Sequence, residues 1–254
     1  MIEQSYGSGL HAFRQSVVAA MRKVKLTTLK EGCSHEQVVP EASYAPWRDD
    51  QDFLAIYERV RTHTLVDVYR CFELWQLTRQ LKTLRGDLLE VGVWRGGTSA
   101  IVGKAARIAG DTSRLWIADT FSGVTKADSR ADTNYRGGEH ADTSEAIVRQ
   151  LLTSADISDF TILSGIFPDE TGCEMDTATI KLCHIDVDAY ASARDVFSWV
   201  WPRMACGGVV VFDDYGFWGC EGVTCAVNEL MAQGTIVVHN LNGHALIFKI
   251  FADG

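Results

Sequence analysis

The sequence predicts an α/β fold with a mostly parallel sheet, helices on both of its faces and an antiparallel hairpin at its end. Short apolar runs alternate with amphipathic helical patterns from residue 86 onward, as they do in strand–helix–strand units. The chain has 254 residues, of which 46% are hydrophobic, enough for one large domain with a substantial core. The last two β-rich runs, 235–238 and 245–250, flank an Asn242-Gly243 pair typical of a tight turn.

Acidic residues follow two of the predicted strands, at the point where each strand ends. The apolar runs 180–185 and 208–212 are separated by a helical pattern, so both strands are expected to point the same way. The acids that follow them are Asp186, Asp188, Asp213 and Asp214. Four carboxylates at one sheet edge repel each other unless a cation lies among them, and oxygen ligands suit Mg²⁺, Mn²⁺ or Ca²⁺. The alternative is that these acids only cap the following helices and face water.

A glycine-rich turn follows the first predicted strand. Residues 86–93 indicate this strand and its turn, and residues 94–99 open a helix that runs to about Ala109. Glycines let the backbone approach a ligand closely, and Thr98 or Ser99 is expected to cap the helix. The spacing is E-x-G-x-x-x-G-G, which differs from the G-x-G-x-x-G of dinucleotide-binding turns.

The second strand is predicted at 114–118 and ends at Asp119, where an acid can accept hydrogen bonds from ribose hydroxyls. The alternative for Asp119 is a turn former or a helix cap. Residues 122–141 are expected to form a mobile loop over the site, ending at His140. A capping box at 142–145 predicts a helix to about Leu152, and a third strand follows at 160–163.

The first 85 residues are expected to form a helical extension or lid, and residues 86–254 the core. A basic helix is predicted over 14–30, and the pattern over 52–84 predicts two helices packed beside the sheet. Phe217 and Trp218 either wall an acceptor pocket or pack on the sheet. His239 and His244 flank the final turn and are expected to face solvent.

Charge and composition exclude several classes of partner. The net charge of −9 argues against nucleic-acid binding, and no apolar stretch or leader pattern indicates a membrane segment or secretion. The seven cysteines lack a disulfide or zinc spacing, which favours a reduced, cytoplasmic protein. The aromatic content of the N-terminal helices suggests a homo-oligomer.

Five segments in this order resemble the motifs of the macrocin O-methyltransferase family: LLEVGVWRGGTS, LWIADTFSGV, LSGIFPDE, HIDVDAYAS and GGVVVFDDYGFWGCEGVTCAVNEL. The resemblance covers about residues 86–230. It implies a Rossmann-like class I methyltransferase sheet and an S-adenosylmethionine- and metal-dependent enzyme that methylates sugar hydroxyls on antibiotics, with Mg²⁺ or Mn²⁺ as cofactor and a small glycoside as acceptor. The chain departs from the family at residues 122–125, at Glu170 and at Ala189.

The resemblance also implies roles for individual residues. Asp186, Asp213 and Asp214 would bind the metal, and Asp188 would be the general base, although both acids of the first pair could instead be ligands. The residues implied to hold the cofactor are Glu90, Gly92, Val93, Gly96, Thr98, Asp119, Thr120, Ser164, Gly165 and Asp186.

Other functions remain open on the sequence alone. An NAD-dependent oxidoreductase would suit the glycine-rich turn and Asp119, but it leaves the strand-end acids unexplained. A cofactor-binding protein without catalysis is a second class, and the complete set of four acids argues against it. Catechol-type methylation is a third reading, because it also uses a metal and a diol-like acceptor.

Overall fold

The computed structural model describes residues 2–21, 23–24, 26–39 and 42–251. Within them, one seven-stranded sheet has the order β3-β2-β1-β4-β5-β7-β6. Its strands are β1 (Asp87–Val91), β2 (Leu115–Asp119), β3 (Phe160–Ser164), β4 (Ile180–Ile185), β5 (Met204–Phe212), β6 (Val238–Asn240) and β7 (His244–Phe248). The first five strands are parallel, and β7 runs antiparallel to both of its neighbours. This arrangement confirms the predicted fold class.

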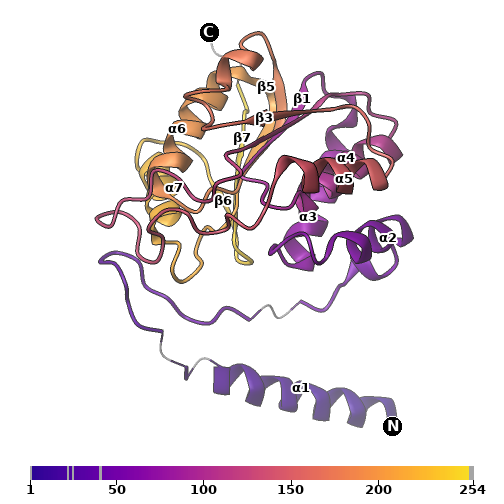
Figure 1. Cartoon of the computed structure of the whole chain (residues 1–254). Helices are drawn as coiled ribbons and strands as arrows, with labels where there is room; N and C mark the ends of the chain where they lie inside the picture. The colour runs from indigo at the N-terminus through magenta and orange to yellow at the C-terminus, as the bar shows by residue number, and fades with distance from the viewer. Residues whose placement is uncertain (1, 22, 25, 40–41, 252–254) are drawn as a thin grey trace.

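Helices cover both faces of the sheet (Figure 1). They are α2 (Gln51–Val60), α3 (Val68–Gln80), α4 (Gly97–Ile108), α5 (Glu145–Ser154), α6 (Tyr190–Val200) and α7 (Glu221–Ala232), and a further helix, α1 (Ile2–Met21), precedes them in the chain. Short 3₁₀ turns lie at η1 (Pro46–Arg48), η2 (Leu81–Thr83), η3 (Gly172–Met175) and η4 (Trp201–Arg203). Helices α2 to α5 pack on one face of the sheet, and α6 and α7 pack on the other.

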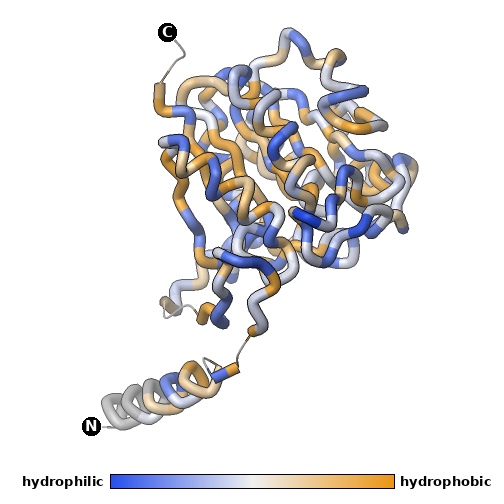
Figure 2. Tube along the Cα trace, turned by 90° about the vertical axis from the view of Figure 1, so that its left-hand side faces the viewer, coloured by the Kyte–Doolittle hydropathy of each residue, from blue (hydrophilic) through white to orange (hydrophobic). Residues whose placement is uncertain are grey.

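Two hydrophobic clusters hold these layers together. Successive strand residues point to opposite faces, so Leu88 belongs to the cluster under α2 to α5 while Leu89 belongs to the cluster under α6 and α7. Figure 2 shows this as apolar strands enclosed by helices of mixed polarity. A parallel sheet covered on both faces favours strands that are mostly apolar, and β5 ends in the apolar run 208–212, while β4 is apolar except for the buried and paired Lys181 and His184.

The N-terminal region differs partly from its prediction. Helix α1 begins at Ile2 and ends at Met21, so the helix predicted over 14–30 starts too late and ends too far along the chain; residues 22 and 25 of that prediction lie outside the described residues. Residues 26–39, which follow, form neither helix nor strand and contain a turn at residues 31–32. In Figure 1, α1 lies apart from the body of the protein. The two helices predicted over 52–84 are confirmed as α2 and α3.

Helices α2 and α3 belong to the same packed core as the sheet. Phe53, Phe72 and Trp75 are buried in one cluster with residues of β1 and α4, and Phe53 packs edge-on against Phe72 and Trp75. Burying a large aromatic side chain contributes roughly 1.5–3 kcal/mol. The boundary predicted at residue 85 stays a prediction, but this face of the sheet is covered by residues that precede it.

Two predicted helix caps are wrong. Gly96, with a φ of 84°, is the residue before α4, so Thr98 and Ser99 lie inside the first turn and are buried. Gly96 takes this position because a left-handed φ costs glycine little. Helix α5 begins after Ser144, whose hydroxyl accepts from the Ile147 amide at 3.3 Å, so the cap lies two residues later than the predicted capping box starts.

The final hairpin is confirmed with shifted strands. Strand β6 covers residues 238–240 instead of 235–238, and β7 pairs with β5 over residues 245–248. Gly243 has a φ of 99°, and a Cβ atom there would lie 2.1 Å from the Phe217 ring. The turn therefore needs glycine, because it packs against the Phe217 ring from the loop after β5.

Candidate active site

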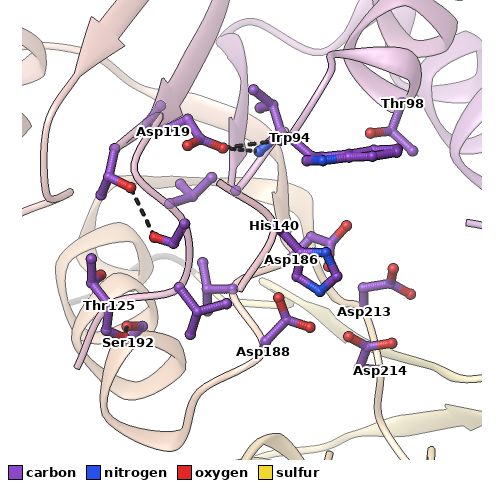
Figure 3. A pocket seen from close by; sticks show the side chains of 18 of the residues that line it. Trp94, Thr98, Asp119, Thr125, His140, Asp186, Asp188, Ser192, Asp213 and Asp214 are labelled. Atoms are coloured by element: carbon purple, nitrogen blue, oxygen red, sulfur yellow. Dashed lines mark hydrogen bonds between the residues drawn. The ribbon is translucent and has the colours of Figure 1, made fainter. Parts of the chain in front are cut away.

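A cavity lies at the carboxyl ends of the parallel strands, where open α/β sheets bind ligands (Figure 3). The turn after β1 and the end of β2 form one part of it, and the acids after β4 and β5 form the other. The predicted site residues that line it are Gly92, Val93, Thr98, Asp119, Thr120, Gly165, Asp186, Asp188, Asp213 and Asp214. The structure therefore brings most of the predicted cofactor residues and all four acids into one cavity.

Gly92 sets how closely the first turn approaches the acidic edge. Its φ is 82°, and a Cβ atom at this position would lie 1.7 Å from the backbone carbonyl oxygen of Asp186. Any side chain would push the end of β1 away from the end of β4. Glycine at this position therefore allows the turn after β1 and the acids after β4 to line one cavity.

Asp119 holds the turn after β1 in place. Its Oδ2 accepts from the amides of Val93 and Trp94 at 2.8 and 3.0 Å, and its Oδ1 accepts from the Phe121 amide at 2.7 Å. Figure 3 shows this carboxylate beside Trp94 at one end of the cavity. Two oxygens offer about four acceptor positions, so capacity remains for a ligand hydroxyl. The predicted ribose contact stays a prediction.

Three predicted cofactor residues lie outside the cavity lining. Gly96 is the residue that caps the start of α4, and Ser164 is exposed at the end of β3. Glu90 is fully buried within the sheet layer, where its carboxylate accepts from the Ser99 hydroxyl and from His184 Nδ1 at 2.8 Å. The structure thus gives Glu90 an internal role, which is to join β1 to α4 and β4.

The second part of the cavity is an acidic cluster. Oxygens of Asp186, Asp213 and Asp214 lie within 4.8 Å of one another, and Asp188 is close to Asp214. Figure 3 shows all four carboxylates gathered on one side of the cavity. Asp188 and Asp214 have φ values of 61° and 60°, which are rare and costly outside glycine. The backbone thus adopts unfavourable conformations to bring these acids together.

The pKa values of this cluster reflect burial and mutual repulsion. Burial and the negative charges of Asp213 and Asp214 raise the pKa of Asp186 well above its usual range. Burial and the charges of Asp213 and Asp188 do the same to Asp214. The carboxylates of Asp186 and Asp214 thus favour a bound proton or another cation beside them.

Asp213 differs from its neighbours because cations surround it. It is almost fully buried, Arg70 Nη1 donates to its Oδ1, and His244 Nε2 lies 3.2 Å from the same oxygen. Burial alone would raise the pKa of Asp213, but the hydrogen bond and charge of His244 and the charge of Arg70 outweigh burial and lower it. Asp213 is therefore the fixed negative charge of the cluster.

Asp188 lies beside the loop over residues 122–141. Burial raises its pKa, while a hydrogen bond from the Tyr135 hydroxyl and the nearby His140 act in the opposite direction. Both of these loop residues line the cavity. The loop is tied to the start of α6 by Asp132, whose Oδ1 accepts from the Tyr190 amide at 2.8 Å. The loop forms part of the site as predicted, and its mobility stays a prediction.

Sequence reasoning missed Arg70, Glu73, Tyr135 and His244. The prediction that His244 faces solvent is wrong, because its side chain is completely buried and its Nδ1 donates to Glu73 Oε2 at 2.5 Å. His239 is exposed at the same turn, as predicted. One signal was available: Arg70 and Glu73 are charged residues within the apolar pattern of a predicted core helix, and such residues are buried only when they are paired.

The acidic cluster fits a divalent cation. Asp186, Asp213 and Asp214 offer three oxygen ligands in one place, and Arg70 balances only part of the negative charge of the four acids. Hard cations such as Mg²⁺ use carboxylate oxygens of this kind together with water. A network of hydrogen bonds behind Asp213 holds its carboxylate in place, as is usual for metal-binding carboxylates.

No helix among the described residues combines the length and apolarity that a membrane span requires. The predicted location in the cytoplasm stays a prediction.

Solved structures show the same fold. The O-methyltransferase NovP aligns with a TM-score of 0.65 at 24% identity, over 74% of this chain and 83% of that chain. CalS11, a calicheamicin methyltransferase, aligns with a TM-score of 0.63 at 16% identity, over 85% and 99% of the two chains. At these identities the likeness establishes the fold, which is the class I methyltransferase sheet.

Sequence comparison identifies the family. The profile described as macrocin O-methyltransferase matches residues 15–241. A tetracenomycin rhamnosyl 4'-O-methyltransferase of Streptomyces olivaceus is 33% identical over 198 residues, which cover 70% of this chain and 76% of that protein. The mycinamicin III 3''-O-methyltransferase of Micromonospora griseorubida is 31% identical, over 59% and 66% of the two chains. The chain belongs to the macrocin O-methyltransferase family and is an S-adenosylmethionine-dependent O-methyltransferase.

Proposed function

We propose that the protein methylates a sugar hydroxyl of a glycosylated natural product with the help of a divalent cation, Mg²⁺ or Mn²⁺. The observation that carries this proposal is the acidic cluster of Asp186, Asp213 and Asp214 inside the cofactor cavity. Two relatives named for methylation on rhamnosyl tetracenomycin and mycinamicin support a sugar acceptor. The family excludes the oxidoreductase reading.

The turn after β1 and the end of β2 are the part of the cavity suited to S-adenosylmethionine. Gly92 lets the backbone of this turn lie close to Asp186, and Thr98 and Asp119 line the same part of the cavity. The sulfonium group of the cofactor supplies a reactive methyl group, so the protein has to orient it and exclude water. Correct orientation of the acceptor oxygen against the methyl carbon contributes roughly 7–11 kcal/mol to catalysis.

The acids are the part of the cavity suited to the acceptor. Asp186, Asp213 and Asp214 would hold the cation, which when bound stabilises an ionised hydroxyl and fixes its direction. Asp188 is the base that removes the hydroxyl proton. Burial raises the pKa of Asp188, which brings this carboxylate closer to the working range of a general base. General-base catalysis typically contributes about 10²–10⁴ in rate.

Apolar and aromatic side chains lie near these acids. Leu65 lines the cavity and is 66% exposed, and Phe217 packs over Arg70, with the guanidinium carbon 4.5 Å from the ring centre. An exposed apolar rim next to a polar centre suits a sugar attached to an apolar aglycone. The sugar would reach Asp188 while the aglycone remains at this rim.

Acceptor competition tests the proposal. Initial rates would be measured with S-adenosylmethionine, Mg²⁺ and a panel of rhamnosylated natural products, with a simple catechol as competitor. The proposal expects methyl transfer to a glycoside that the catechol inhibits weakly, and a loss of at least about 10²-fold in kcat for Asp188→Asn. Faster transfer to the catechol than to every glycoside would favour the catechol-type alternative. Unchanged kcat in the variant would remove Asp188 as the base.

A further inference from the structure

Two side chains of helix α3 act on Asp213, one directly and one through His244. Arg70 and Glu73 lie about one turn apart on this helix and both face the acidic edge of the sheet. Arg70 Nη1 donates directly to Asp213 Oδ1. Glu73 reaches the same oxygen indirectly, because its Oε2 accepts from His244 Nδ1 at 2.5 Å and His244 Nε2 lies 3.2 Å from Asp213 Oδ1.

His244 is fixed in this position. Its side chain has no exposed surface, and Glu73 anchors it by one ring nitrogen so that the other faces Asp213. The second oxygen of Glu73 accepts from Asn240 Nδ2 at 2.7 Å, so Glu73 holds both strands of the final hairpin. Asn242, in the turn between them, donates to Asp67 at the start of α3 at 3.1 Å. The hairpin and α3 are therefore joined by three polar contacts.

These contacts restrict the Asp213 carboxylate. The terminal torsion of an aspartate is broad, so the direction of its oxygens is set by their partners. Both Arg70 and His244 address Oδ1, which leaves Oδ2 free of these two donors. Oxygens of Asp186 and Asp214 lie within 4.8 Å of the ligand oxygen of Asp213.

We infer that Glu73 and His244 are positioning residues that hold the Asp213 carboxylate in the orientation that binds the divalent cation. The inference rests on the proposed function of the acidic cluster. Neither residue lines the cavity, so they act through Asp213 and not on the acceptor or cofactor. Residues that orient a metal ligand in this way typically change metal affinity by about 10–100-fold when they are removed.

A second reading of His244 makes it a ligand itself. His184, Asp213 and His244 are all buried, and one ligand atom from each lies within 4.8 Å of the others. His184 is anchored at Nδ1 by Glu90, and its Nε2, like His244 Nε2, makes no hydrogen bond of good geometry among the described residues, although His244 Nε2 lies 3.2 Å from Asp213 Oδ1. The guanidinium of Arg70 on Asp213 opposes a second cation at this place. The stoichiometry of metal binding separates the two readings.

The test compares Glu73→Leu, Glu73→Gln and His244→Leu with the unmodified protein. Glu73→Gln keeps an oxygen that can accept from His244, and Glu73 is partly exposed, so both substitutions there are compatible with folding. Calorimetry would measure the Kd for Mg²⁺ with S-adenosylhomocysteine bound, and the Kd for S-adenosylhomocysteine in EDTA. Thermal unfolding would verify that each variant is folded.

The inference expects one Mg²⁺ per chain in the unmodified protein. It expects Kd for Mg²⁺ to rise about 10–100-fold in Glu73→Leu and His244→Leu and to stay within about threefold in Glu73→Gln. The affinity for S-adenosylhomocysteine in EDTA should stay within twofold, because a general loss of structure would weaken it as well.

Unchanged Mg²⁺ affinity in a folded Glu73→Leu variant would overturn the inference, and so would two ions per chain of which His244→Leu loses one. Absence of Mg²⁺ binding to the unmodified protein would instead remove the proposed function on which the inference rests. If His244→Leu does not fold, the two Glu73 variants decide the question by the same measurement.

Discussion

Replacing Asp186 by asparagine removes one negative charge from the acidic cluster with little change in shape. Asp186 lies within 4.8 Å of the ligand oxygens of Asp213 and Asp214. Two unit charges at that distance repel by about 3 kcal/mol at an effective dielectric constant of about 20. Partial protonation and the nearby guanidinium of Arg70 reduce the repulsion, so Asp186→Asn should stabilise the metal-free protein by about 1–2 kcal/mol.

The sign of this effect should reverse when a divalent cation is present. A bound ion stabilises the folded state by about 2.7 kcal/mol at a concentration of 100 times its Kd. Asp186→Asn loses one of three carboxylate ligands, so it should lose most of this stabilisation. In excess Mg²⁺ the variant should therefore be less stable than the unmodified protein, because the lost stabilisation by the bound ion exceeds the gain from removing the charge repulsion.

Urea unfolding at pH 7.5, in EDTA and in excess Mg²⁺, measures both effects. Asp156→Asn is the matched control, because it makes the same chemical change at a carboxylate whose side chain is 86% exposed. The control should change the free energy of unfolding by less than about 0.5 kcal/mol in both buffers. A loss of stability for Asp186→Asn in EDTA, or an undiminished gain from Mg²⁺, would refute the electrostatic account of the site.

Two further predictions test the parts of the fold that build the site. Asp111→Asn should cost about 3–5 kcal/mol in urea unfolding at pH 7, because it leaves the buried charge of Lys181 without a counter-ion and with only the Leu84 carbonyl as partner. Burial would raise the pKa of Asp111, but hydrogen bonds from Lys181 and Ser113 lower it. The stabilisation by the ionised Asp111 is therefore complete above the ordinary carboxyl pKa of about 4 and is lost as pH falls below that value. The difference in unfolding free energy between variant and parent should shrink in acid, and a constant difference would contradict this. Gly92→Ala places a Cβ atom 1.7 Å from the Asp186 carbonyl at a φ of 82°, so calorimetry should find S-adenosylhomocysteine binding weakened at least tenfold, and unchanged binding would contradict the role assigned to this turn.

Much of the sheet could be predicted because its strands have distinct sequence patterns. Strand β4 was predicted with its observed bounds, since a strand buried on both faces is mostly apolar and this one ends where the acids begin. The order of acids and glycines along parallel strands then places them at one edge of the sheet. That rule is sufficient to bring Asp186, Asp213 and Asp214 together.

The partners of these acids could not be predicted from the same patterns. Arg70 comes from α3 and His244 from β7, and their meeting at Asp213 depends on how helix and hairpin pack. A histidine beside an Asn-Gly turn is ordinarily exposed, and only the pairing of β7 with β5 buries this one. Glu90 likewise follows the pattern of a cofactor ligand in sequence, although its carboxylate turns inward toward Ser99 and His184.

The prediction of the residue that caps α4 was wrong for a local reason. Thr98 and Ser99 are residue types that favour the cap position, but the turn before them requires a left-handed backbone at Gly96. Glycine therefore occupies the cap, and Ser99 is used for Glu90 instead. A prediction from side-chain preference alone cannot weigh a backbone requirement that comes from the turn as a whole.

Methyl transfer measured as a function of free Mg²⁺ tests the central claim most directly. The assay would follow conversion of S-adenosylmethionine to S-adenosylhomocysteine with a glycosylated acceptor, first in EDTA and then in metal buffers of rising Mg²⁺ concentration. The account predicts no turnover in EDTA, full recovery on addition of Mg²⁺, and no recovery in Asp186→Asn. The full rate of transfer in EDTA would contradict the assignment of Asp186, Asp213 and Asp214 as the ligands of a required cation.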